Sequence, residues 1–168
     1  MMSAKIGLTQ VTDDTKQLIN SLESALIEVE TDMTIFFRLL AECTLTASFE
    51  ECWSVIQPSF YIKDINLQVQ EVWKDWFTRY QQQLLLEKSS DEDRKNDMNS
   101  LNPKYVLRNY MAQLAIDKAD EGDYTLIEEL FNSLKKPYEE QTEYQRWFAK
   151  RPEWARHKVG CSMLSCSS

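Results

Sequence analysis

The chain has 168 residues, of which only three are glycine and four are proline. An all-β fold needs turn residues roughly every 8–12 positions, and this chain does not supply them. The composition therefore predicts an all-α fold, a compact multi-helix domain of about seven helices with a coil tail at the C-terminus.

The net charge of −8 is unevenly distributed along the chain. From Arg146 onward there are five basic residues against one acidic residue, whereas the preceding residues include 14 basic and 26 acidic side chains. An acidic body argues against general nucleic-acid binding, which needs a basic face to displace counterions. The basic tail either docks on the acidic body, docks on another acidic surface, or is solvated.

Four segments in the first half of the chain have apolar residues at helical spacing, each preceded by a side chain that can cap a helix. The last is the longest, and its aromatic stripe favours core packing over a ligand site. The predicted starts are Thr12 or Asp13, Asp32, Ser48 and about Asp64, with the third helix ended by Pro58 and the fourth running to Lys88. The stripe includes Trp73, Trp76, Phe77 and Tyr80.

Residues 89–100 are polar and charged, which is typical of a loop or a short exposed helix. The pair Asn102-Pro103 then predicts a helix start, because asparagine is a good N-cap and proline suits the first helical position. Gly122 is expected to end that helix, with Asp123 capping the next one.

Pro137 is expected to stop this helix, and a last short helix is predicted from about 139 to 149. We expect residues 1–149 to form the helical domain and residues 150–168 to form a basic, thiol-bearing tail.

The four cysteines suggest no metal site, since there is no Cys-x-x-Cys pair and only one histidine. Cys43 and Cys52 lie in apolar helical surroundings, which favours buried, reduced thiols. The N-terminus has no apolar signal core, and no apolar run is long enough to cross a bilayer. We therefore expect a soluble protein in a reducing compartment, with neither a membrane nor a nucleic acid as partner.

No catalytic constellation is evident in the sequence. The three glycines are far apart, at 7, 122 and 160, so they cannot form a phosphate-binding loop. Arg108 and Asn109 could contact an anion, but a structural ion pair or helix cap is the favoured interpretation. The residues alone predict a helical module with a thiol on its tail.

Several blocks, in order along the whole chain, resemble one protein family. They are Met2-x-x-Lys-Ile-Gly-Leu8, Asp32-Met-Thr-Ile-Phe-Phe-Arg38, Asn102-Pro-Lys-Tyr-Val-Leu-Arg-Asn-Tyr110 with the following Ala112-Gln113, Ala115-Ile116 and Gly122-Asp123, then Pro137-Tyr138, Arg151-Pro-Glu-Trp154 and Ser165-Cys-Ser-Ser168. Together they are similar to the C-terminal third of the selenoprotein O family, the YdiU-type proteins.

This resemblance implies a kinase-like parent protein that transfers AMP from ATP to hydroxyl side chains of proteins. ATP and Mg²⁺ would bind upstream of the region present here, so the resemblance places no catalytic residue on this chain. The implied partners are the missing N-terminal kinase-like domain and protein substrates. The implied location is the cytoplasm for a bacterial protein, or the mitochondrion for a eukaryotic one.

The resemblance also makes Cys166 a redox candidate, because family members carry selenocysteine or cysteine at this position. In the family this group is implicated in a disulfide to the kinase-like part. Some members have a second cysteine three residues earlier, where this chain has Met163, so Cys161 is the alternative partner. An inert thiol is the other interpretation. The remaining motif residues are expected to be structural: Asp32, Arg38, Asn102, Pro103, Arg108, Asn109 and Trp154.

Three functions are therefore open. The chain is the C-terminal helical domain of a protein adenylyltransferase, a free-standing helical interaction module, or a small thiol-redox protein using Cys161 and Cys166. An apolar patch left exposed by missing domains would favour the first, and a well-sealed surface would favour the second.

Overall fold

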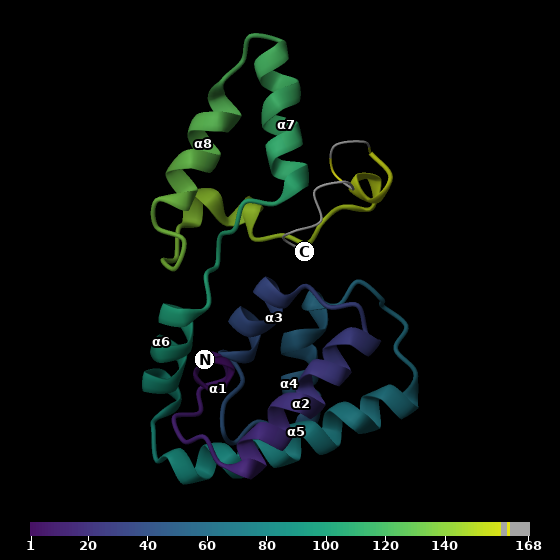
Figure 1. Ribbon diagram of the computed structural model, residues 1–168, viewed down its shortest axis with the longest axis vertical. Coiled ribbons are helices and arrows are strands. Elements are labelled where there is room, and N and C mark those ends of the chain that lie inside the picture. The colour runs from purple at the N-terminus through teal and green to yellow at the C-terminus, as the bar shows by residue number, and fades with distance from the viewer. Residues whose placement is uncertain (159–160, 162–168) are drawn as a thin grey trace. The chain divides into compact units, whose positions relative to one another are not determined.

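Helices are the only extended regular elements in the residues that the structure describes, 1–158 and 161. An isolated backbone bridge between Thr31 and Phe60 is the sole β-type pairing recorded there. The computed structural model therefore confirms the all-α class (Figure 1). It divides into two compact units, residues 1–102 and 103–168, and each is described separately.

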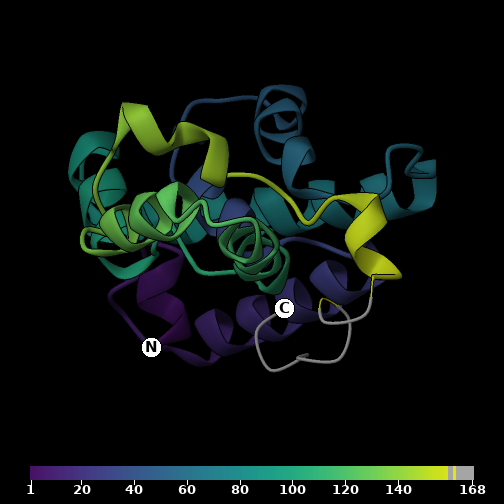
Figure 2. The ribbon, with the colours of Figure 1, turned by 90° about the horizontal axis from the view of Figure 1, so that it is seen from above.

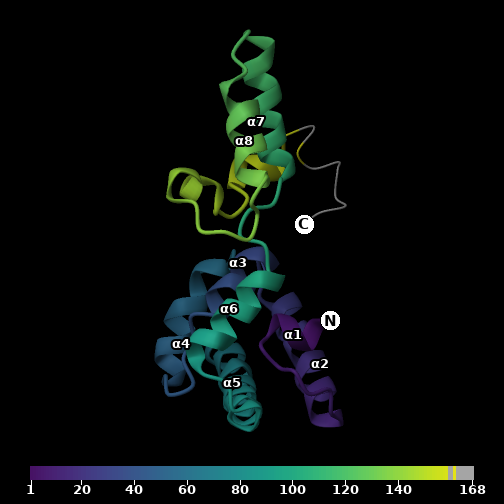
Figure 3. The same ribbon diagram turned by 90° about the vertical axis from the view of Figure 1, so that its left-hand side faces the viewer.

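The first unit contains six α-helices and one short 3₁₀ helix among its residues. They are α1 (Met2–Lys5), α2 (Asp13–Glu28), α3 (Met33–Leu40), α4 (Phe49–Ile56), η1 (Gln57–Ser59), α5 (Leu67–Glu87) and α6 (Asp91–Leu101). In this unit α2 packs along α5, and α3 packs on α4 (Figures 1 and 3). Helix α1 was not predicted, because a single turn is too short to show a helical period.

Side-chain caps begin the helices of the first unit close to where the sequence predicted them. Each cap accepts a hydrogen bond from the backbone N–H three residues later, which would otherwise lack a partner. The caps are Thr12, Asp32, Ser48 and Asn66, the third forming a reciprocal capping box with Glu51. The first three starts are confirmed, and the cap of α5, Asn66, lies two residues after the predicted Asp64.

The aromatic stripe of α5 is core, as predicted. Trp73 and Tyr80 are at most 1% exposed, and Trp76 stacks on Tyr80 with ring centroids 4.8 Å apart. Trp76 donates to the Leu18 carbonyl at 3.0 Å, and Tyr80 donates to the Ile6 carbonyl at 2.7 Å. Burial raises the pKa of Tyr80, which keeps its hydroxyl protonated as a donor. These bonds fix α2 and the N-terminal segment against α5.

The predicted helix start at Asn102-Pro103 is wrong. Helix α6 ends at Leu101, and Asn102 is extended, with φ −109° and ψ 104°, at its C-terminal end. Helix α7 begins only at Asn109, with Arg108 in the N-cap position. Proline disfavours helical backbone in the residue before it, and the amides of Lys104 and Tyr105 instead donate to the Pro137 carbonyl, at 2.7 and 3.1 Å.

The second unit is built on two helices, α7 (Asn109–Asp120) and α8 (Thr125–Leu134), which lie side by side (Figure 2). Gly122 turns the chain between them with φ +86°, a conformation that favours glycine. Asp123 accepts from the Thr125 amide at 3.0 Å, although the N-cap position itself is Tyr124. The helix predicted at 139–149 is shorter and of the 3₁₀ type, η2 (Thr142–Trp147).

A second core lies between these helices and the segment that follows them. It contains Tyr105, Tyr110, Met111, Ala115, Leu130, Trp147, Ala155 and Cys161. The short 3₁₀ helix η3 (Glu153–Arg156) supplies Ala155, which is fully buried. The boundary between the two units lies inside the predicted 1–149 domain, whose own limits stay a prediction. Among the described residues, no helix is both long and apolar enough to span a membrane.

Gly7 and Gly122 provide a matched pair of backbone tests, since both have positive φ. A Cβ at Gly7 would lie 2.7 Å from Cγ of the buried Arg94, whereas a Cβ at Gly122 would meet nothing within 4 Å. We expect Gly122→Ala to cost about 1–2 kcal/mol from backbone strain alone. Gly7→Ala should cost about 1–3 kcal/mol more because of overpacking. Urea unfolding followed by circular dichroism checks the order, and equal losses would contradict the packing argument.

Candidate functional site

Three of the sequence blocks that carry the family resemblance meet at one buried polar cluster in the first unit. Asn102, 2% exposed, donates from Nδ2 to the Lys5 carbonyl at 2.8 Å and to the Met98 carbonyl at 2.9 Å. Arg38, 5% exposed, donates to the carbonyls of Asn99 and Asn102, both at 3.3 Å. The cluster thus joins α1, α3 and the end of α6. Its donors satisfy carbonyls that a helix end leaves without intrahelical partners.

Asp32 has a similar structural role at the other end of α3. One carboxylate oxygen accepts from the Ile35 amide at 3.1 Å, and the other accepts from the Tyr61 hydroxyl at 3.2 Å. The carboxylate is also favourably placed near the positive end of the helix dipole. Asp32 and Arg38 were expected to be structural, and their contacts in the first unit support that interpretation.

The remaining part of the Asn102–Tyr110 block lies in the second unit, next to the Pro137-Tyr138 element. Besides the two backbone bonds to Pro137, the Tyr105 hydroxyl donates to the Gln141 carbonyl at 2.9 Å. Gln141 is itself buried and donates to the carbonyls of Ser133 and Lys136, both at 2.9 Å. These hydrogen bonds therefore hold the coil segment 103–108 against the loop 136–141.

Lys104 is a buried cation that the sequence did not single out. Its ammonium group forms an ion pair with Glu140, donates to Gln145 at 2.7 Å, and lies 5.1 Å from the centre of the Phe148 ring. A buried charge is tolerated only when paired and hydrogen-bonded, and this one is. No local pattern marks it, because its partners come from residues about 40 positions later.

The Arg151–Trp154 block covers the start of α7. The Trp154 ring, 44% exposed, packs edge-on against Tyr110 with centroids 6.2 Å apart. Lys158 forms an ion pair with Asp117 of α7, and hydrogen bonds from Lys158 and Gln113 lower the pKa of the Asp117 carboxyl. This part of the basic segment therefore docks on acidic residues of its own unit.

Of the two redox candidates, only Cys161 lies among the residues that the structure describes. Cys161 is 6% exposed and packs in the second core. Cys166 lies outside the described residues, so its role stays a prediction. Cys43 and Cys52 are buried free thiols, as expected.

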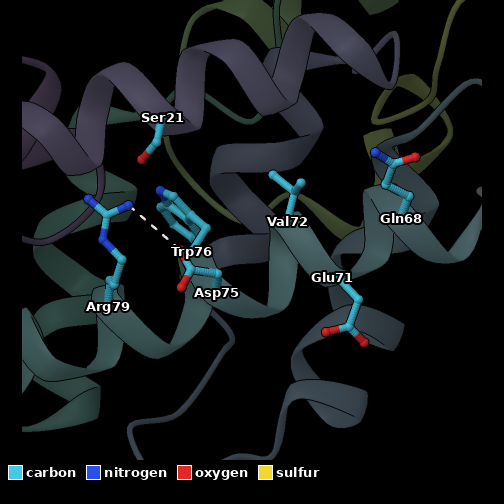
Figure 4. A pocket seen from close by; sticks show the side chains of 7 residues that line it. All are labelled: Ser21, Gln68, Glu71, Val72, Asp75, Trp76 and Arg79. Atoms are coloured by element: carbon cyan, nitrogen blue, oxygen red, sulfur yellow. Dashed lines mark ion pairs between the residues drawn. The ribbon is translucent and has the colours of Figure 1, made fainter.

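A hollow of about 450 Å³ lies between α2 and α5 in the first unit. Trp76 and Arg79 of α5 point toward Ser21 of α2, whereas Glu71 points away from it (Figure 4). Arg79 is paired with Asp75 at 3.7 Å. None of the residues that carry the family resemblance lines this hollow. The hollow also has no nucleophilic side chain paired with a base. Among the described residues, no group of histidine, cysteine and carboxylate side chains could hold a metal ion.

The outer face of α8 carries a stripe of exposed apolar side chains. Tyr124, Ile127 and Phe131 follow one stripe and are 61%, 44% and 62% exposed. The adjacent face, with Leu130 and Ser133, is buried in the second core. Helix α8 therefore has two neighbouring apolar faces, one buried in its own unit and one exposed.

Comparison with known proteins assigns the chain to a family. The family model described as "Protein adenylyltransferase SelO" matches residues 1–135. The chain belongs to the SelO family. The match ends just after α8, so both the Arg38–Asn102 cluster and the apolar face of α8 lie within the SelO region.

Curated relatives support the SelO assignment. The chain is 54% identical over 169 residues to the protein nucleotidyltransferase YdiU of Flavobacterium johnsoniae, a match that covers all of this chain and 32% of that protein. The YdiU proteins of Rhodopirellula baltica and Tolumonas auensis are 43% and 44% identical, again over all of this chain and 33% and 32% of their own lengths. The chain thus spans about a third of the length of these relatives.

Asn102→Asp tests the buried polar cluster. The substitution keeps the shape of the side chain but replaces the donor that serves Lys5 and Met98 with an acceptor facing two carbonyls. We expect a loss of about 2–3 kcal/mol in the free energy of unfolding, since the Lys5 carbonyl loses its donor and a carboxylate oxygen would face both carbonyls. Asn96→Asp, at an exposed position of α6, is the control and should change stability little. Similar urea midpoints for the two variants would rule out an anchoring role for Asn102.

Proposed function

We propose that this chain is the C-terminal helical part of a longer protein adenylyltransferase. The parent protein transfers AMP from ATP to protein hydroxyls, and its kinase-like part holds ATP and Mg²⁺. The family match, and a length of about a third of that of the curated relatives, support this proposal. Nucleotidyl transfer needs positioned metals, cationic clamps and a phosphate loop, so we expect no activity from this chain alone.

The observation that carries this proposal is the uncovered apolar face of α8. Tyrosine, isoleucine and phenylalanine side chains in one stripe are unfavourable in water, by roughly 25 cal/mol per Å² of apolar surface. Such a stripe is expected where a domain interface has been opened. Relatives with about three times the length have ample additional chain to cover it. We therefore assign this face to the remainder of the full-length polypeptide.

Within that parent, the role of the chain is to brace the catalytic part rather than to contribute reacting groups. The motif residues Asp32, Arg38 and Asn102 all hydrogen-bond to backbone or to tyrosine within the first unit. Among the described residues, no observation favours the thiol-redox alternative at Cys161, which packs in the second core.

The size of the native protein tests the proposal. An antibody raised against this chain should detect a band far above 19.8 kDa in source cells. The longer protein, incubated with labelled ATP and Mg²⁺, should transfer AMP to proteins, whereas this chain should neither bind ATP tightly nor become labelled. A sole band at 19.8 kDa, or micromolar ATP binding by this chain in calorimetry, would count against the proposal.

Phe131→Asp tests the α8 face directly. In this chain the substitution should change stability by no more than about 1 kcal/mol, the scale of its exposed contact with Lys135. In the longer protein it should lower the melting temperature clearly, because a charge would be buried in the interface. Asn132→Asp, on the polar side of α8, is the matched control and should be neutral in both.

Equal effects of the two substitutions in the longer protein would refute the assignment of the α8 face. Concentration-dependent dimerisation of this chain that Phe131→Asp abolishes would instead assign the face to a second copy, and would also refute it.

A further inference from the structure

Two of the four cysteines meet in the first core. Cys43 lies in the turn after α3, and Cys52 lies in the first half of α4. They are 4% and 2% exposed, and the Cys43 sulfur lies 3.9 Å from the Cys52 carbonyl oxygen. The two thiols also interact directly, since a hydrogen bond from the Cys43 side chain lowers the pKa of Cys52.

The environment of the pair makes the two sulfurs unequal. The hydrogen bond that lowers the pKa of Cys52 raises the pKa of Cys43, whose thiol keeps its proton. Burial and the Glu51 carboxylate oppose the lowered pKa of Cys52, whereas the buried guanidinium of Arg94, which donates to the Cys43 carbonyl, supports it. Thiolate is the nucleophilic form of cysteine, so we assign the attacking role to Cys52.

Both thiols belong to the first core, but residues that flank them in sequence are exposed. Glu42 and Thr44, on either side of Cys43, are exposed, and so is Glu51 beside Cys52. Only nine positions separate the two cysteines, and the intervening loop begins and ends near them. Because both cysteines are buried, we expect a small oxidant to reach the sulfurs more readily than a bulky reagent.

We propose that Cys43 and Cys52 form an oxidation site that closes to a disulfide when the protein meets a hydroperoxide. The Cys52 thiolate attacks the peroxide, giving a sulfenic acid, and one oxygen leaves as water after taking up a proton. The Cys43 sulfur then attacks the sulfenic sulfur, and the second oxygen leaves as water. Two thiols and one hydrogen peroxide give one disulfide and two waters, and a small dithiol reverses the step by exchange. This site does not depend on the adenylyltransferase assignment.

Peptide mapping tests the site with this chain as it is. The native protein is treated with hydrogen peroxide, its remaining thiols are alkylated after unfolding, and it is digested with trypsin. Cleavage after lysine and arginine leaves Cys43 and Cys52 together in peptide 39–63, and Cys161 and Cys166 together in peptide 159–168. We expect most of peptide 39–63 to be recovered unalkylated and lighter by two hydrogen atoms, and to become doubly alkylated when dithiothreitol precedes alkylation.

Controls separate this site from the tail and from unfolded protein. Cys161→Ser should leave the cross-link in peptide 39–63 unchanged, whereas Cys52→Ala should abolish it. Recovery of peptide 39–63 with both thiols alkylated, while peptide 159–168 is oxidised, would overturn the proposal. So would a cross-link in peptide 39–63 that forms only when the protein is oxidised in urea.

Discussion

The hydrogen bonds around Asn102 are the constraint on which the first unit depends most. A helix that ends in the interior leaves carbonyl groups without partners, and α6 ends against α1 and α3. Arg38 and Asn102 supply the missing donors, and Asn102 also binds the Lys5 carbonyl. Because Arg38 and Asn102 are buried, loss of either donor leaves a carbonyl that water cannot readily reach. The cluster thus connects segments about 100 residues apart in sequence.

This constraint gives a physical reason for the motif residues that carry the family resemblance. Arginine provides several donors from one rigid group, and asparagine provides two donors at a position where an acid or an apolar residue would fail. Asp32 applies the same logic at the start of α3, as an acceptor for the Ile35 amide. Their residue types are explained by the backbone groups with which they form hydrogen bonds, so none of them needs a direct role in catalysis.

Local signals in the sequence were sufficient for most of the helices. The caps Thr12, Asp32 and Ser48 act within three residues, so each start could be predicted from neighbouring side chains. The aromatic stripe of α5 was likewise predicted as core from its spacing. The failure at Asn102-Pro103 has a tertiary cause. Asn102 instead ends α6, since its side chain donates to the Lys5 carbonyl, and the amides of Lys104 and Tyr105 donate to the Pro137 carbonyl.

The candidate site was less accessible to sequence reasoning, for the same reason. A resemblance directed attention to the tail thiols, yet Cys161 lies in the second core. Lys104 and Gln141 carry buried hydrogen bonds with partners that no local pattern reveals. Residues 89–100 were expected to form a loop or a short exposed helix, but Asp91 accepts from the Leu45 amide at 3.0 Å and pairs with the buried Arg94.

Arg94 links the thiol pair to the parts of the first unit that the polar cluster holds in place. Its guanidinium contacts the Cys43 carbonyl, the Asp91 carboxylate and the Met98 sulfur. Met98 in turn offers its carbonyl to Asn102. A buried guanidinium with all of these partners cannot follow a displaced Cys43 without leaving other groups unsatisfied. Asp91, which pairs with Arg94, also holds the Leu45 amide just after Cys43. Closure of a disulfide therefore requires Cys52 and α4 to move toward Cys43 rather than the reverse.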